Sequence, residues 1–173
     1  MSIIAKSIGG KLSPFLSQII PVLKEKAKNL NPNESLDDDN ELSETALSTL
    51  EAIIRKCPLD VNDYITELLR DSFKLCTYDP NYIYDDADEE MNSDEDDDGE
   101  GWGDDEFSDN DGGQDDDDDT SWKVRRSAVA IIDAIVKTRP DRVKEIVQNY
   151  SPTLIDRVKE RVDDVKVEIL NAF

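Results

Sequence analysis

The stretch SWKVRRSAVAIIDAIVKTRP, residues 121–140, decides the fold class. Its large apolar residues recur three and four positions apart, at Val124, Ala128, Ile131, Ile132 and Ile135. This spacing places them on one face of an α-helix. Pro140 has no backbone N–H to extend that helix, so we expect the helix to end just before it.

Amphipathic helices of the same kind are expected on the N-terminal side. The first begins with Ser13 as N-cap and Pro14 as first residue, and Pro21 should kink it rather than end it. Its apolar face comprises Phe15, Ile19, Leu23, Ala27 and Leu30. Residues 31–40 are expected to form a polar loop. The next two helices bury Leu42, Ala46, Leu50, Ile53, Ile54 and Cys57, then Val61, Ile65, Leu68, Leu69, Ser72, Phe73 and Cys76.

Proline residues are also expected to end or kink the other predicted helices. Pro58 should stop the helix before it, and Pro80 disfavours helix at Asp79. After residue 140 a further helix carries Val143, Ile146, Val147, Tyr150, Leu154 and Val158, with Pro152 as a kink. A last pattern, Val165, Ile169 and Phe173, is cut by the end of the chain, which suggests a fragment or an early-terminating product. Strand signals are absent, so the prediction is all-α.

The helices occur as repeated pairs. Cys57-Pro58 aligns with Arg139-Pro140, 82 positions later. The apolar positions then coincide: Leu42 with Val124, Ala46 with Ala128, Leu50 with Ile132, Ile53 with Ile135 and Val61 with Val143. Two helices in about 40 residues is the period of HEAT and armadillo repeats. We therefore predict a HEAT/armadillo-type α-solenoid, in which stacked helical hairpins bury a continuous core.

Each repeat also begins with a charge pattern. An acidic residue stands five positions before the first aliphatic residue of a copy, at Asp37, Asp119 and Glu160. A base follows the aliphatic residue in two copies, as Arg125 and Lys166, whereas Ser43 stands there in the first. We expect the acid to accept hydrogen bonds at the turn and the base to pair with a neighbouring acid, a structural ladder.

An acidic insert interrupts the repeats at residues 85–119. It holds half of the chain's 42 acidic residues and no Lys or Arg, and therefore nearly all of the net charge of −22. Its few large apolar residues are Met91, Trp102 and Phe107. Such a segment cannot bury enough surface to offset its ordering entropy, so we expect a disordered loop. The predicted organisation is HEAT repeats over 1–84, the insert over 85–119, and HEAT repeats over 120–173.

Two motifs flank the insert and carry a family resemblance. Thr77-Tyr-Asp-Pro-Asn-Tyr leads into it, and Ser121-Trp-Lys-Val-Arg-Arg-Ser-Ala leads out. With the helix of residues 41–58 and Leu154-Ile-Asp-Arg-Val-Lys-Glu-Arg, these parts closely resemble the cullin-associated, neddylation-dissociated (Cand) proteins. The resemblance covers essentially the whole chain and a small internal part of the N-terminal repeat region of those long solenoids. Val162 departs from the family, which usually has an acid there.

The resemblance implies a non-enzymatic protein that wraps an unmodified cullin and its RING subunit. Such proteins compete with adaptors, so that substrate receptors of cullin-RING ubiquitin ligases are exchanged. This chain lacks the family's adaptor-displacing element, so the resemblance implies a scaffold or cullin-binding piece, acting in the cytoplasm and nucleus. The alternative is an acidic-loop binding module for basic proteins, such as a histone chaperone or a karyopherin-like receptor.

Other function classes find little support in the residues. Histidine is absent, which removes the commonest general base and metal ligand, so neither an enzyme nor a cofactor is expected. Residues Asp94, Asp96, Asp98, Gly99 and Asp105 match calcium-loop positions, but without flanking helices or a final Glu, so no metal site is predicted. No apolar run approaches the 18 residues of a membrane span. Cys57 and Cys76 are expected to be buried free thiols.

The candidate partner-binding residues are few. Lys123, Arg125 and Arg126 form the sharpest basic cluster, although the adjacent acids disfavour a nucleic-acid patch. Trp102 and Phe107 are candidate contacts within the insert. Ser93 and Ser108 each have an acid three residues later and suit an acidophilic kinase. No small-molecule substrate is expected.

Overall fold

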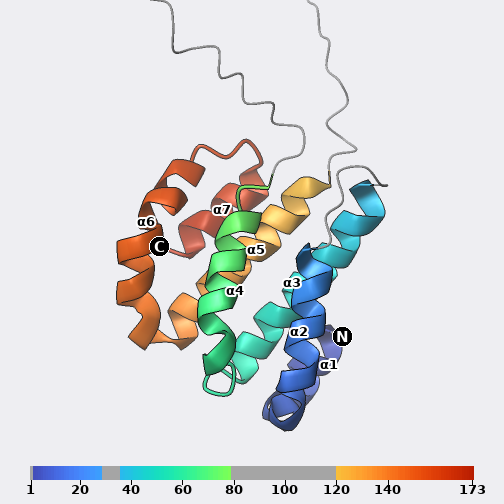
Figure 1. Ribbon diagram of the computed structural model, residues 1–173. Helices are drawn as coiled ribbons and strands as arrows, with labels where there is room; N and C mark the ends of the chain where they lie inside the picture. Colours follow the sequence, from blue (N-terminus) through green and yellow to red (C-terminus); the bar gives the residue numbers. More distant parts are fainter. Residues whose placement is uncertain (1, 29–35, 79–119) are drawn as a thin grey trace, which may run out of the picture. The chain divides into compact units, whose positions relative to one another are not determined.

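The computed structural model describes residues 2–28, 36–78 and 120–173, which are helical and contain no strand (Figure 1). The all-α prediction is therefore confirmed. The α-helices are α1 (Ser2–Ile8), α2 (Leu16–Lys28), α3 (Leu36–Lys56), α4 (Asn62–Leu75), α5 (Ser121–Thr138), α6 (Val143–Arg157) and α7 (Asp163–Asn171). Two short 3-10 helices, η1 (Gly9–Phe15) and η4 (Pro140–Arg142), join α1 to α2 and α5 to α6.

The helices stack as hairpins in two layers within one compact unit (Figure 1). The first helices of successive hairpins, α1, α3, α5 and α7, pack against one another in that order. The second helices α2 and α4 pack against the first helix of the next hairpin, α3 and α5 respectively. This is the arrangement of a HEAT-type solenoid, and it continues from α3 and α4 to α5 as consecutive repeats.

The predicted apolar faces of α4 and α5 form the centre of the core. All five apolar residues named for α5 are 0% exposed. The seven residues named from Val61 to Cys76 are all buried as well. Cys57 and Cys76 are buried free thiols, as predicted. Burial raises the pKa of the Cys76 thiol to about 11, so it is neutral at physiological pH. None of the described helices combines the length and the apolar character needed to cross a bilayer.

The start of the chain differs from the prediction. A helix, α1, precedes Gly9, whose φ of +50° lies in the left-handed region that glycine adopts without strain. Pro14 lies inside η1, and α2 begins only at Leu16. The predicted N-cap at Ser13 is therefore wrong, because its Oγ donates to Asp60 Oδ2 at 2.6 Å, after α3. Helix α2 does continue through Pro21, as predicted.

Helix α3 begins earlier than predicted, and five of the six residues predicted for its apolar face are buried, all except Leu42. It starts at Leu36, so the predicted loop over 31–40 is wrong for residues 36–40, while 29–35 lie outside the described part. Asn40 is buried, and its Nδ2 donates to Thr120 Oγ1 at 3.0 Å. Leu42 is exposed, and Ser43 is buried in its place with its Oγ donating to the carbonyl oxygen of Ala27 at 2.8 Å. These tertiary hydrogen bonds set the face that α3 presents.

Several residues assigned to apolar faces near the ends of the chain are exposed. They are Phe15, Val147, Val158 and Phe173. Helix α6 buries Ile146 and Leu154, and its Tyr150 ring stacks on Phe73 of α4 with centroids 4.2 Å apart. Periodicity identifies the apolar side of a helix correctly, but it does not state how much of that side another helix covers.

The predicted acid–base ladder is present at one junction. Arg125 and Glu160 are both buried, with Nε to Oε2 at 3.1 Å and Nη2 to Oε1 at 3.4 Å. Glu160 Oε1 also accepts the backbone N–H groups of Arg161, at 2.9 Å, and Val162, at 3.3 Å. Lys166 instead pairs with Asp163 at 3.0 Å on the surface. The side chains of Asp37 and Asp119 lie outside the described part.

The environment of Glu160 favours its charged form. Burial alone would raise the pKa of this carboxyl, but Arg125, Arg157 and the backbone N–H groups of Val162 and Arg161 together hold its pKa below the ordinary value. A carboxyl with a lowered folded pKa stabilises the fold above its unfolded pKa, about 4.3 for Glu. That contribution is lost as the pH falls.

Replacing Ala128 with Asp should unfold the repeats on the C-terminal side. Ala128 is 0% exposed on the core face of α5, and an unpaired buried carboxylate costs about 3–5 kcal/mol. Thermal unfolding followed by circular dichroism measures the effect. The control is Ala130→Asp on the same helix, where the side chain is half-buried and the loss should be smaller. Equal unfolding temperatures for Ala128→Asp and the wild type would contradict the assignment.

Replacing Glu160 with Gln should lower the free energy of unfolding by about 3 kcal/mol at pH 7, because it leaves Arg125 buried without its counter-charge. The difference from the wild type should shrink as the pH falls below about 4.3, where Glu160 of the unfolded chain takes up a proton, and it should be lost once the pH has fallen through the lower folded pKa. Urea unfolding of both proteins at pH 7 and pH 3 measures this. A difference that stays constant with pH would show that the charge of Glu160 contributes nothing.

Candidate functional site

A groove lies between the second helices α2 and α4. It has a volume of about 350 Å³ and is lined by Pro21, Lys24, Glu25, Lys28, Tyr64 and Glu67. Both helices pack against first helices rather than closely against each other, which leaves this space between them. The groove is open to solvent on the side away from the first-helix layer.

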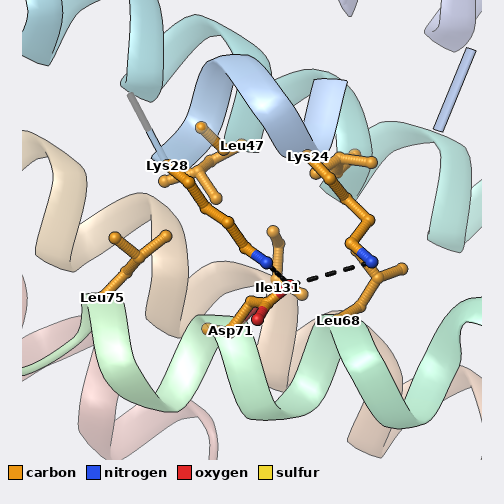
Figure 2. A pocket seen from close by; sticks show the side chains of 10 residues that line it. Lys24, Lys28, Leu47, Leu68, Asp71, Leu75 and Ile131 are labelled. Carbon is orange, nitrogen blue, oxygen red and sulfur yellow. Dashed lines mark ion pairs between the residues drawn. The ribbon is translucent and has the colours of Figure 1, made fainter. Parts of the chain in front are cut away.

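The deepest part of this region is apolar (Figure 2). A small adjoining pocket of about 10 Å³ is lined by Leu47, Leu50, Leu68, Leu75 and Ile131, with Lys24, Ala27, Lys28, Asp71 and Ser72 at its edge. A volume of that size holds at most about one water molecule. This pocket is therefore closed core packing contributed mainly by α3, α4 and α5, and the usable space is the wider groove that shares Lys24 and Lys28 with it.

Ion pairs bridge the groove from wall to wall (Figure 2). Lys24 and Lys28 lie one turn apart on α2, opposite Glu67 and Asp71, which lie one turn apart on α4. Lys28 Nζ is 2.6 Å and Lys24 Nζ is 3.9 Å from Asp71 Oδ2, and Lys24 also pairs with Glu67. The Lys28–Asp71 contact lacks hydrogen-bond geometry, so it is ionic. The hydrogen bond from Lys24 lowers the pKa of Glu67.

This arrangement suits recognition of a polypeptide rather than a reaction. The two lysines and the three carboxylates of Glu25, Glu67 and Asp71 nearly offset one another, so the groove has no strong net charge for a phosphate or metal ion. Among the described residues, no three His, Cys, Asp or Glu side chains are placed to hold a metal ion. A groove that combines an aromatic side chain with charged side chains has the mixed composition of a protein-binding surface.

Sequence reasoning did not single out the groove residues. A signal was nevertheless present. Lys24 with Lys28, and Glu67 with Asp71, are like-charged pairs four residues apart. Such pairs destabilise an isolated helix, so two of opposite sign on successive second helices indicate that the helices face each other. Using this signal requires knowing that α2 and α4 are neighbours.

The predicted basic cluster does not form one surface. Arg126 is exposed, and Lys123 is half-buried with its Nζ 5.9 Å from the centre of the Trp122 ring. Arg125 is 1% exposed and ion-paired with Glu160, so its burial removes it from any partner-binding surface. Trp122, in the first turn of α5, is partly buried against the core.

The remaining predicted site residues lie in the acidic insert. Trp102, Phe107, Ser93 and Ser108, and the insert boundaries at 85 and 119, fall outside the described residues. Their predicted roles as partner contacts and phosphorylation sites stay predictions.

Comparison with known proteins identifies relatives over almost the whole chain. No family model matches. Cullin-associated NEDD8-dissociated protein 1 of Dictyostelium discoideum is 44% identical over 98% of the chain, and cullin-associated NEDD8-dissociated protein 2 of Mus musculus is 39% identical over 98%. A protein of Emericella nidulans named as the C-terminal part of cullin-associated NEDD8-dissociated protein 1 is 41% identical over 78%.

The chain is much shorter than these relatives. It spans 13–14% of the length of each of the three, so the match concerns one segment of them. The predicted placement in the N-terminal repeat region stays a prediction. The identity extends across both groups of helices, which stack here as consecutive HEAT-type hairpins. The chain belongs to the family of the cullin-associated NEDD8-dissociated proteins, of which it represents a segment.

Proposed function

We propose that the chain is a segment of a non-enzymatic HEAT-repeat scaffold that binds the core of an unmodified cullin-RING ubiquitin ligase. The partners are the cullin and its RING subunit, and the whole scaffold regulates exchange of adaptors and substrate receptors in the cytoplasm and nucleus. The observation that supports this most is identity of 39–44% over 98% of the chain to proteins named for cullin association.

The groove between α2 and α4 is the proposed contact for the cullin core. It lies between two second helices, and its volume of about 350 Å³ can accept side chains of a partner once the ion pairs that cross it rearrange. Tyr64 stands half-buried in its wall. Tyrosine is enriched among the residues that dominate binding energy, because it buries a large area and loses few rotamers.

Nucleic acid, membrane and small molecules have no part in the proposal. A net charge of −22 repels a phosphate backbone and an anionic bilayer surface. The described surface offers a groove of compensated charges rather than an enclosed pocket with convergent polar groups.

Replacing Tyr64 with Ala should weaken binding to an unmodified cullin-RING core about tenfold or more, because it removes an aromatic side chain from the groove wall. Surface plasmon resonance with immobilised chain measures the dissociation constant. The matched control is Leu59→Ala, which truncates an exposed apolar side chain outside the groove lining and should leave binding unchanged. Both variants must keep the unfolding temperature of the wild type within a few degrees.

A second binding experiment distinguishes the proposed cullin contact from a general acidic module that binds basic proteins. Core histones replace the cullin core, and salt is raised from low values to about 0.15 M and beyond. Binding that rests on charge alone falls steeply with salt, whereas binding through aromatic and apolar contacts, such as those of Tyr64, persists. Histones that bind as tightly as the cullin core at about 0.15 M salt would overturn the choice of a cullin core as partner. Equal binding by the wild type and Tyr64→Ala would overturn the groove as the contact site.

A further inference from the structure

Arg125 lies where the described chain stops after α4 and resumes before α5. Tyr78 is the last described residue before 79–119, and Thr120 and Ser121 are the first two after it. Nη1 of Arg125 donates to the carbonyl oxygen of Tyr78 at 3.0 Å and to Ser121 Oγ at 2.8 Å. Because the same nitrogen contacts both oxygens, the distance between the two oxygens cannot exceed the sum of the two hydrogen-bond lengths.

The neighbouring helix holds the returning end as well. Asn40, 2% exposed near the start of α3, donates from Nδ2 to Thr120 Oγ1 at 3.0 Å. The outgoing end is thus tied to α5 through Tyr78, and the incoming end is tied to α3 through Thr120. Both ties are made by side chains that the surrounding helices bury.

The next hairpin holds Arg125 in place. Its Nε and Nη2 point to the carboxylate of Glu160, which is itself fixed by backbone N–H groups of the turn before α7. A guanidinium has five donors in a rigid planar fork and can serve three acceptor groups at once. A lysine ammonium has the charge but not this geometry.

The equivalent position of the preceding hairpin makes a simpler contact. Ser43, 82 positions earlier, donates to the carbonyl oxygen of Ala27 near the end of α2. Each of these first helices therefore ties back to the end of the preceding second helix. The smaller side chain, Ser43, follows the short connection of residues 29–35. The longer side chain, Arg125, follows the long connection of residues 79–119.

We propose that Arg125 is a staple that closes the base of segment 79–119, so that the length of this segment does not disturb the stacking of α4 on α5. Joining the ends of a chain segment costs entropy that grows with its length. The hydrogen bonds of Arg125 to Tyr78 and Ser121 offset that cost at the junction where it is largest. Arg125 is thus a positioning residue for the two ends of the segment.

The test combines a change in the length of segment 79–119 with a substitution of Arg125. In one background the full chain is kept, and in the other residues 79–119 are replaced by Gly-Ser-Gly-Ser, which reaches about 13 Å. The short chain should fold and unfold about 5 °C higher, because its connection costs less entropy. Arg125→Lys should lower the unfolding temperature more in the full chain than in the short one, where the linker itself keeps Tyr78 near Ser121.

The control is Ser43→Ala, which removes the equivalent hydrogen bond of the preceding hairpin. Its loss in unfolding temperature should be the same in both backgrounds. If Arg125→Lys does not fold in the full chain, Ser121→Ala removes one acceptor of the staple and is expected to show the same dependence on segment length. Equal losses in both backgrounds for these variants, or a short chain that loses its helical signal, would overturn the proposal.

Hydrogen–deuterium exchange locates the effect. In the full chain with Arg125→Lys, amides of residues 74–78 and 120–124 should exchange about tenfold faster, while those of residues 61–69 keep their protection. A uniform loss of protection over all helices would show that Arg125 stabilises the core generally, and would overturn its assignment as a staple.

Discussion

Helical hairpins of this kind cannot cover their own apolar faces, and the structure depends on each hairpin being covered by the next. Helix α5 shows the consequence. It packs against α3, α4 and α7, and its apolar face is completely buried. By contrast α6 leaves much of its apolar surface exposed in the described unit. Stability is therefore carried by contacts between hairpins, and it is greatest where a helix has neighbours on both sides.

Buried polar side chains set the register of this stack. Arg125, Asn40 and Ser43 each make a hydrogen bond from one hairpin to another. Arg139 does the same at the other end of α5, where its Nη1 donates to the carbonyl oxygen of Pro58 at 2.9 Å. Apolar packing tolerates small shifts along a helix, but a buried donor loses its partner when it shifts. These groups therefore select one arrangement among several that would bury similar apolar area.

The same stacking creates the groove proposed to bind a partner. Since α2 and α4 pack mainly against first helices, the space between them is bridged by side chains rather than filled. The bridging ion pairs are partly exposed, and such pairs contribute little to stability individually. They can exchange partners at small cost, which suits a surface that binds a protein. The proposed cullin contact and the solenoid are thus consequences of one packing scheme.

Most of the helices, the apolar faces of α4 and α5 and the repeat of hairpins are predictable from the sequence alone, because these features arise from local spacing along the chain. The stripes of α4 and α5 and the helix ends before Pro58 and Pro140 are of this kind. The repeat also predicted that its base pairs with a neighbouring acid, and Arg125 with Glu160 is such a pair. The resemblance to Cand proteins came from motifs at residues 77–82 and 121–128.

Which individual residues at the helix ends are buried, and which polar side chains meet across helices, depends on tertiary packing. It placed Ser43 in the core and Leu42 outside, and it gave the Ser13 hydroxyl to Asp60 instead of a helix start. It also showed that Lys24 and Lys28 face Glu67 and Asp71, and that Arg125 is buried at the junction with residues 79–119. These features depend on which residues of distant segments lie opposite each other, and periodicity within one helix carries no information about its neighbour.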